Sequence, residues 1–299
     1  MNNHTEIDLL AAYFTLAGNV VPFSPAGLVS PFRFEDRVEA AAKAGWKGIG
    51  LLLVDAQAVS ARIGLAEMRR ILNANGMKHV ELELLIDWYL DGERRAKSDK
   101  IRHEILQMAE MLGARAVKVS PGRGEDPTKP RPDELVPDVP RMIEGFVGLC
   151  HDAANHGTAI VMEICPYSNV STIATGRAIV EGANQPNGGL LLDIWHIARG
   201  GNDYGEIAKI PPVFIGSIEL DDADAELEGT LWDDTVHRRK LPGEGGLDVP
   251  AFIKAVRTAG YHGPWGVEIL SETYRKLPLE EMARRSFQAT MAQFIAARD

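Results

Sequence analysis

The sequence contains little cysteine and no long apolar segment. Its two cysteines, Cys150 and Cys165, are too few for a disulfide framework, so we expect a reducing compartment. No apolar stretch reaches the roughly 18 residues that a membrane-spanning helix needs. The segment Met1–Asp8 is polar and acidic and lacks the apolar stretch of a signal peptide. These absences predict a cytoplasmic protein that does not enter a membrane.

Basic residues are outnumbered by acidic ones. The chain carries 32 Lys and Arg against 42 Asp and Glu, which gives a formal net charge of −10. Proteins that bind nucleic acid usually present a basic surface that displaces counterions from the phosphates, and no basic stripe is visible in the sequence. We therefore expect a small-molecule substrate, with neither nucleic acid nor a membrane as a partner.

Short apolar segments alternate with longer helical patterns along the whole chain. The short segments have the length and composition of strands: Leu10–Leu16, Gly48–Val54, His79–Ile86, Ala114–Val119, Ala159–Ile164, Gly189–Ile194, Val213–Leu220 and Trp265–Leu270. Helical segments follow them in turn: Phe34–Ala44, Leu65–Asn75, Asp99–Leu112, Val139–His156, Ser171–Glu181, Tyr204–Ala208, Val249–Ala259 and Leu279–Ala297. This alternation predicts the parallel sheet of an α/β protein, and its count is that of a (β/α)8 TIM barrel.

Glycines follow several of the predicted helices, at Gly45, Gly76, Gly113, Gly157 and Gly260. Glycine adopts the left-handed conformation that commonly ends a helix, so these positions support the helix boundaries. A doubly wound open sheet would give the same local pattern. The Gly-x-Gly-x-x-Gly motif of its dinucleotide-binding version is absent after the first predicted strand.

The length of 299 residues fits a single TIM barrel domain over residues 1–299, because closed α/β barrels run to roughly 250 residues as one domain. Two long loops extend this domain, at about residues 121–138 and 221–247. Each follows the carboxyl end of a predicted strand, the face on which TIM barrels carry their sites. Long loops at that face are usually functional.

Acidic residues stand near the ends of the last four predicted strands: Glu163, Asp193, Glu219 and Glu268. In a closed barrel these side chains converge on one rim. Burying several like charges together costs much free energy unless a cation or protons offset them. Oxygen ligands are those that Mg²⁺, Mn²⁺ and neighbouring divalent ions prefer. The sequence therefore predicts a divalent metal site.

Three further residues are candidates for binding the substrate. His196 follows Asp193 by three residues, and we expect it to bind a substrate hydroxyl or to support the metal site. Lys118 ends the fourth predicted strand and points to the rim by strand alternation, where it could bind a carboxylate or hydroxyl. Trp88 follows the third predicted strand and either forms an apolar wall of the site or packs in the core.

The chain resembles the sugar phosphate isomerase/epimerase superfamily, the xylose isomerase-like TIM barrels that include ketose 3-epimerases. The resemblance covers nearly the whole chain and is strongest from Ala159 to Ser271. The segments that carry it are Met162–Glu163, Asp193–His196, Glu219–Ala223, Leu241–Asp248 and Gly260–Glu268.

The resemblance implies a divalent metal ion (Mn²⁺, Mg²⁺ or Co²⁺) held by Glu163, Asp193, Glu219 and Glu268. Glu219 departs from the family, which has histidine or glutamine at this position. An extra carboxylate adds a negative charge to the ligand set, and three outcomes are open. Glu219 holds a proton with a raised pKa, a nearby Arg or Lys offsets its charge, or it does not touch the metal.

The resemblance also implies the chemistry. Glu163 and Glu268 would act as acid and base on a substrate carbon next to a carbonyl, and a metal would make the C–H proton removable through an enediolate. The family places an arginine before the Pro-Gly turn, which falls on Arg238 or Arg239 here. The expected function is a metal-dependent isomerase or epimerase of a sugar or related hydroxy-carbonyl compound, in carbohydrate metabolism.

Two alternatives remain open from the sequence. Similar barrels include dehydroshikimate and inosose dehydratases, lyases in which loss of a β-hydroxyl follows the same proton abstraction, and the motifs do not separate the two reactions. A non-catalytic binding protein is the other alternative if the acids at the rim bind no metal. Barrels of this kind often pair, so the resemblance also leaves a homo-oligomer open.

Overall fold

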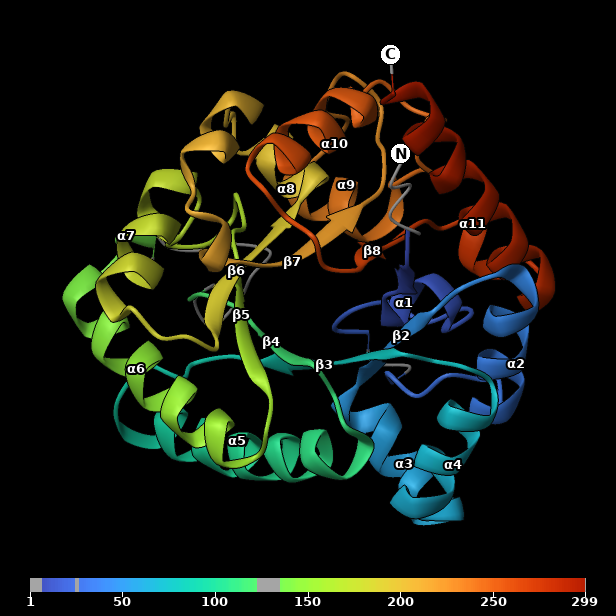
Figure 1. Cartoon of the computed structure of the whole chain (residues 1–299), viewed down its shortest axis with the longest axis horizontal. Helices are drawn as coiled ribbons and strands as arrows, with labels where there is room; N and C mark the ends of the chain where they lie inside the picture. Colours follow the sequence, from blue (N-terminus) through green and yellow to red (C-terminus); the bar gives the residue numbers. More distant parts are fainter. Residues whose placement is uncertain (1–6, 25–26, 123–134, 299) are drawn as a thin grey trace, which may run out of the picture.

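The strands of the protein form one closed barrel of parallel strands in the order β1 to β8 (Figure 1). The computed structural model describes residues 7–24, 27–122 and 135–298. The strands are β1 (Leu9–Ala11), β2 (Gly48–Leu52), β3 (His79–Leu85), β4 (Ala116–Val119), β5 (Ala159–Glu163), β6 (Gly188–Asp193), β7 (Ile215–Leu220) and β8 (Trp265–Val267). Parallel pairing of β1 with β8 closes the barrel. The predicted TIM barrel is confirmed.

Helices surround the barrel (Figure 1). The longer ones are α2 (Phe34–Ala44), α3 (Leu53–Ile63), α4 (Leu65–Ala74), α5 (Gly92–Leu112), α6 (Val139–Asn155), α7 (Ile173–Ala183), α10 (Val249–Thr258) and α11 (Leu279–Ala296). The shorter α-helices are α1 (Tyr13–Leu16), α8 (Ile194–Arg199) and α9 (Leu231–His237). The 3-10 helices include η2 (Tyr204–Lys209), η3 (Pro212–Phe214) and η4 (Tyr274–Lys276). None of the helices in the described part of the chain is long and apolar enough to cross a membrane.

Two helices end at a glycine as predicted, α2 and α5. Gly45 follows α2 with φ of 110°, and its amide donates to the carbonyls of Ala41 and Ala42. Gly113 follows α5 with φ of 64°. A side chain would be strained at these φ values, so glycine ends both helices at little cost and lets the chain turn into β2 and β4.

Some element boundaries differ from the prediction. The first predicted strand is wrong beyond Ala11, because α1 begins at Tyr13. The second predicted strand likewise extends too far, since α3 begins at Leu53 and was not predicted. A short apolar run does not distinguish a buried strand from a buried helix by periodicity alone. The sixth predicted helical segment, Tyr204–Ala208, is the 3-10 helix η2.

The structure describes the second of the two predicted loops, about residues 221–247, more fully than the first, about residues 121–138. Residues 123–134 of the first loop lie outside the described residues. The second loop contains α9 and two isolated bridges, which pair Asp222 with Lys240 and Arg238 with Ser271. These bridges join the loop back to the ends of β7 and β8, so this loop is part of the rim of the barrel.

Candidate active site

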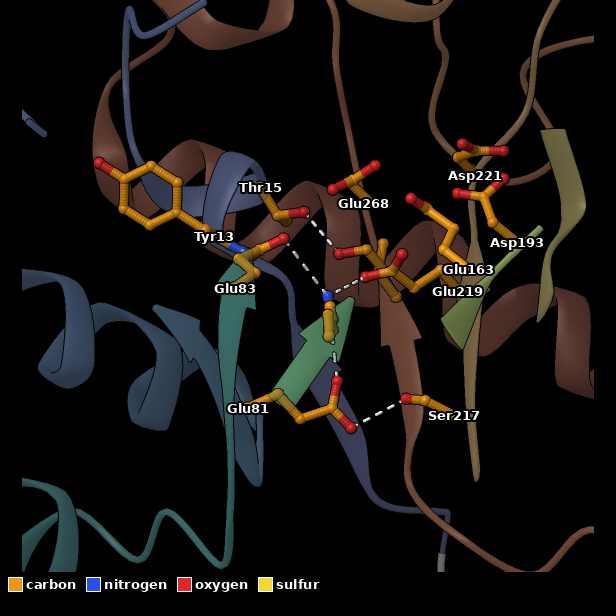
Figure 2. A network of polar contacts seen from close by, with 12 residues as sticks. Tyr13, Thr15, Glu81, Glu83, Glu163, Asp193, Ser217, Glu219, Asp221 and Glu268 are labelled. Carbon is orange, nitrogen blue, oxygen red and sulfur yellow. Dashed lines mark hydrogen bonds and ion pairs between the residues drawn. The ribbon is translucent and has the colours of Figure 1, made fainter. Parts of the chain in front are cut away.

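A cavity of about 230 Å³ opens among the segments at the carboxyl ends of the strands. Its charged and polar groups come from several strands and from the segments that follow them. They are Glu83, Lys118, Glu163, His196, Thr235, Arg239 and Glu268. Figure 2 shows Glu163, Glu219 and Glu268 near one another, with Asp193 and Asp221 beside them and Glu83 on the opposite side.

The barrel register explains how three strand-end carboxylates come together. Glu163 is the last residue of β5 and Asp193 the last residue of β6. Asp193 pairs in register with Glu219 of the neighbouring β7. One carboxylate oxygen from each of these three buried residues lies within 4.8 Å of the others. Residues that are 30 and 26 positions apart in the sequence therefore form one cluster because parallel strands end at one rim.

The cluster meets the chemical requirement of a divalent cation. Its donors are carboxylate oxygens, which hard divalent ions prefer, and they are close enough to share one ion. Glu163 also belongs to a second group of candidate ligand atoms with Cys165 and His196. The Nδ1 atom of His196 is buried and has no hydrogen-bond partner among the described residues. Both groups share Glu163, so this residue is central to either arrangement.

Two buried cations accompany the carboxylates. The first is Lys118 of β4, whose Nζ donates to Oε1 of Glu219 and lies 3.7 Å from Oε2 of Glu83. It also lies 3.9 Å from Oε2 of Glu81. Burial opposes the charge of Lys118, but these carboxylates outweigh that effect and raise the pKa of its ammonium well above the usual value. The carboxylates around Lys118 therefore favour its charged form.

The second cation is Arg239, which is 1% exposed. Its Nη1 donates to Oδ2 of Asp193 at 2.6 Å and to Asp221, and it lies 3.3 Å from Oε2 of Glu268. The guanidinium also lies 5.2 Å from the centre of the Trp195 ring. Arg239 thus compensates carboxylates at the end of β6 and directly after β7 and β8, and a cation–π contact adds to its placement.

A buried aspartate shapes the turn after Arg239. Asp222 accepts hydrogen bonds from the amides of Gly243, Gly245 and Leu247, each at 2.9 Å. A Cβ atom at Gly245 would lie 2.3 Å from the carbonyl oxygen of Ala223, so a side chain does not fit there. The Pro-Gly turn is therefore fastened to the end of β7, which fixes where the preceding arginine enters the site.

Burial raises the pKa of several carboxyls in the cavity. The pKa of Glu268 rises to about 8, mainly because the group is buried, while Arg239 opposes the rise. Burial also raises the pKa of Glu83, and Lys118 opposes it. For Glu219 the same two effects act, burial raising the pKa and Lys118 lowering it. The site concentrates more acidic groups than its cations offset.

His196 lines the cavity. Asp193 ends β6 and caps α8, and its Oδ1 accepts from the His196 amide at 3.0 Å. Because of this cap, α8 begins directly after β6, and the imidazole of His196 lines the cavity. Its Nε2 lies 3.2 Å from Oε1 of Glu163 and 3.2 Å from Nη2 of Arg239. His196 therefore connects a metal-ligand candidate with the buried arginine.

The structure shows which of the other predicted site residues, Arg238, Arg239 and Trp88, line the cavity. Arg238 is partly exposed, pairs with Glu228 at 2.5 Å and does not line the cavity, so the structure singles out Arg239. Trp88 is buried, its Nε1 donates to the Ser120 carbonyl at 2.8 Å, and its ring packs against Phe146. Trp88 does not line the cavity, which corresponds to the packing alternative and not to an apolar wall of the site.

Sequence reasoning did not single out several residues near these groups, among them Glu83 and Cys165. Glu83 lines the cavity from β3, where Glu81 and Glu83 alternate with buried apolar residues. That two-residue period is the signal that could have identified them as facing the barrel interior. Cys165 is buried, and its Sγ lies 3.3 Å from Oε2 of Glu163.

The chain matches a known family over most of its length. The family model described as Xylose isomerase-like TIM barrel matches residues 38–293. Among curated proteins, the 3-dehydroshikimate dehydratase of Pseudomonas aeruginosa is 32% identical over 132 residues, which are 44% of this chain and 20% of that protein. The inosose isomerase of Halalkalibacterium halodurans is 27% identical over 143 residues, 46% of this chain and 49% of that one. These matches span about half or less of the relatives' length.

Solved structures show the same fold. The IOLI protein with a bound zinc atom superposes with a TM-score of 0.82 at 20% identity, over 97% of this chain and 99% of that one. A D-psicose 3-epimerase in the presence of D-fructose gives a TM-score of 0.73 at 16% identity, over 97% and 100% of the two chains. At these identities the similarity establishes the fold alone.

Proposed function

The chain belongs to the xylose isomerase-like TIM barrel family, and on that premise we propose that it is an isomerase or epimerase of a hydroxy-carbonyl compound. The observation that carries this proposal is that two buried carboxyl groups, Glu163 and Glu268, line one cavity at the barrel rim. Two such groups can remove a proton from a carbon and return one to a carbon or oxygen.

Proton transfer needs a base and an acid within reach of the same substrate carbon. Glu163 ends β5 and Glu268 directly follows β8, so the two carboxyls approach the cavity from different strands. One takes the C–H proton next to the carbonyl, which gives an enediolate. The other delivers a proton to the enediolate. Delivery to the same carbon gives epimerisation; delivery to the neighbouring carbon gives isomerisation, in which the hydroxyl proton also moves to the former carbonyl oxygen as the new carbonyl forms.

Glu163, Asp193 and Glu219 would hold a divalent metal ion, with Glu268 as the fourth ligand implied by the family. Such an ion supplies positive charge that polarises the carbonyl and stabilises negative charge on its oxygen. Mn²⁺, Mg²⁺ and Co²⁺ are the expected metals, and the zinc of the IOLI structure supports a divalent ion in this type of barrel.

The remaining polar groups would bind and orient the substrate. His196 and Arg239 lie beside Glu163 and Glu268 respectively, so they can contact the oxygens next to the reacting carbon. Arg239 is itself fixed by Asp193 and by Thr235, whose Oγ1 accepts from its Nη2 at 2.9 Å. A donor that does not need to reorganise during the reaction is well suited to stabilise developing negative charge.

A dehydratase is the second candidate function, and Glu83 favours it. This third carboxyl lines the same cavity, and burial raises its pKa, which favours the protonated form. After a base removes the C–H proton, a protonated carboxyl can give its proton to a β-hydroxyl that leaves as water, and a carbon–carbon double bond forms. The similarity to 3-dehydroshikimate dehydratase also supports this reaction.

Incubation of the metal-loaded protein in D₂O with a panel of ketoses and cyclic hydroxy-ketones tests both candidates. Deuterium in the recovered substrate or in an epimer or isomer supports the leading proposal. A new product with the ultraviolet absorption of an enone supports the dehydratase. Neither deuterium exchange nor a new product across the panel, with metal bound at one ion per chain, would contradict the proposed function.

A further inference from the structure

The cavity has a polar base and walls of a different character. The polar base consists of the carboxyls and cations described above. The walls are apolar. Their residues lie in or after α1, in β2, in or after β3 and after β8, and they are Phe14, Leu28, Leu52, Leu84, Ile86 and Leu270. A sugar that exposes hydroxyls on every carbon would leave several of them without partners against such walls, and unpaired buried hydroxyls weaken binding.

An aromatic series runs from the outer edge of the cavity to its base. The ring centres of Phe23 and Trp232 lie 5.4 Å apart, and those of Trp232 and Tyr167 lie 5.9 Å apart. Tyr167 in turn lies 5.6 Å from the His196 ring, and all four residues line the cavity. Edge-to-face contacts of this kind hold aromatic rings in place and leave faces for a further ring.

Phe23 is the outermost member and is not placed there by core packing. It is 55% exposed, although its side chain is large and apolar. Its φ of 58° lies in the left-handed region, which is costly for a bulky residue. Strained residues of this kind concentrate at ligand sites, because the surrounding structure must hold them against the strain. An exposed, strained phenylalanine at the mouth of an apolar cavity indicates contact with an apolar ligand.

We propose that the substrate carries an aromatic group: its hydroxy-carbonyl part lies at the polar base, and an aryl substituent packs against Tyr167, Trp232 and Phe23. The hydroxy-carbonyl half of this assignment rests on the proposed function. The aryl half rests only on the walls of the cavity and can be tested without turnover. The inferred substrate class is a hydroxy-ketone, cyclic or open, that bears an aromatic ring.

Two small ketones that differ in one group test the aryl part of the assignment separately from the hydroxy-carbonyl part. 2-Hydroxyacetophenone and hydroxyacetone share the hydroxy-ketone group, and the first replaces a methyl group with a phenyl ring. Calorimetric titration of the metal-loaded protein should give an affinity at least about tenfold higher for the phenyl ketone, the effect of one well-packed aromatic contact. Equal affinities, or no measurable binding of the phenyl ketone, would overturn the proposal.

Variants of the aromatic residues test where the phenyl ring of the ligand binds. Trp232→Leu and Phe23→Ala should each weaken binding of the phenyl ketone severalfold and leave hydroxyacetone unchanged. Val213→Ala is the matched control, because it also truncates an exposed apolar side chain, 74% exposed and not lining the cavity, and should change neither affinity. Phe23→Ala keeps the test valid if Trp232→Leu disturbs folding, which circular dichroism would reveal. Unchanged phenyl-ketone affinity in both folded variants would refute the aromatic wall.

The outcomes distinguish this inference from the proposed function. If the phenyl ketone binds preferentially but no hydroxy-ketone exchanges deuterium, the aryl site stands and the reaction is wrong. If ketoses without an aromatic group exchange deuterium and the phenyl ring gives no advantage in affinity, the reaction stands and the aryl site is wrong.

Discussion

The ammonium group of Lys118 on β4 donates a hydrogen bond to the carboxylate of Glu219 on β7, the position at which related sequences are expected to have histidine or glutamine. Lys118 and Glu219 are 3% and 1% exposed, so the pair is shielded from water. A carboxylate together with an ammonium carries no net charge, as a neutral imidazole does. The ion pair therefore keeps the charge around the carboxylates of the candidate metal site close to that of a site with histidine.

Removing the charge of Lys118 should destabilise the protein. In Lys118→Met, Glu219 remains buried without a compensating cation, and loss of one partner of a buried pair costs about 3–5 kcal/mol. Urea denaturation of the metal-free protein measures this loss. The double variant Lys118→Met/Glu219→Gln should recover much of it, because the unpaired charge is gone as well. Strictly additive losses would show that the pair is not coupled.

Removal of the bound divalent metal with a chelator should abolish the proposed isomerase or epimerase activity, and addition of Mn²⁺, Co²⁺ or Mg²⁺ should restore it. We expect Asp193→Asn to lower metal content in direct metal analysis and Glu219→His to bind metal more tightly than the parent protein. Exposed Glu226→Asn is the matched control and should bind one metal as before. Activity that survives chelation without bound metal would contradict a metal-dependent reaction, and unchanged affinity in Glu219→His would place Glu219 outside the metal's coordination.

Replacing either acid–base carboxyl should abolish turnover while the fold survives. Glu163→Gln and Glu268→Gln keep the shape of the side chain but remove its proton transfer, which typically contributes a factor of about 10²–10⁴ to a rate. Steady-state kinetics and circular dichroism measured together separate lost chemistry from lost folding. A folded variant with the parent rate would exclude the altered residue from acid–base catalysis.

The two neighbouring arginines should behave very differently. Arg239→Met leaves buried Asp193 and Asp221 without their cation, and we expect a loss of about 3–5 kcal/mol in unfolding free energy. Arg238→Met removes only a partly exposed pair with Glu228 and should cost about 1 kcal/mol or less. Urea denaturation compares them directly, and similar losses in both variants would contradict the role given to Arg239.

Glu83 distinguishes the two candidate reactions. If the enzyme is an isomerase or epimerase, Glu83→Gln should retain deuterium exchange at the substrate carbon, because Glu163 and Glu268 perform both proton transfers. If it is a dehydratase, the same variant should still exchange deuterium but form the enone more slowly. Nuclear magnetic resonance and ultraviolet absorption follow the two products in one reaction mixture. Loss of deuterium exchange itself would assign Glu83 to the proton abstraction.

The barrel and the gathering of its acidic residues could be predicted from the sequence. Helix α2 has the predicted bounds Phe34–Ala44, because an apolar stripe and a following glycine define it locally. The convergence of Glu163, Asp193 and Glu219 follows from their places at the ends of adjacent parallel strands. Both inferences need only the order of residues along the chain and the geometry of a parallel barrel.

The tertiary structure decided which side chains share the site. Lys118 and Glu219 are 101 residues apart, and Arg239 and Asp193 are 46 apart, so neither ion pair leaves a local pattern in the sequence. Arg238 and Arg239 are equivalent by motif, and only the path of the loop after α9 buries the second. The aromatic series of Phe23, Trp232 and Tyr167 comes from the segment after α1, the first turn of α9 and the segment after β5. Side-chain direction in loops depends on distant packing, which residue order and strand periodicity do not specify.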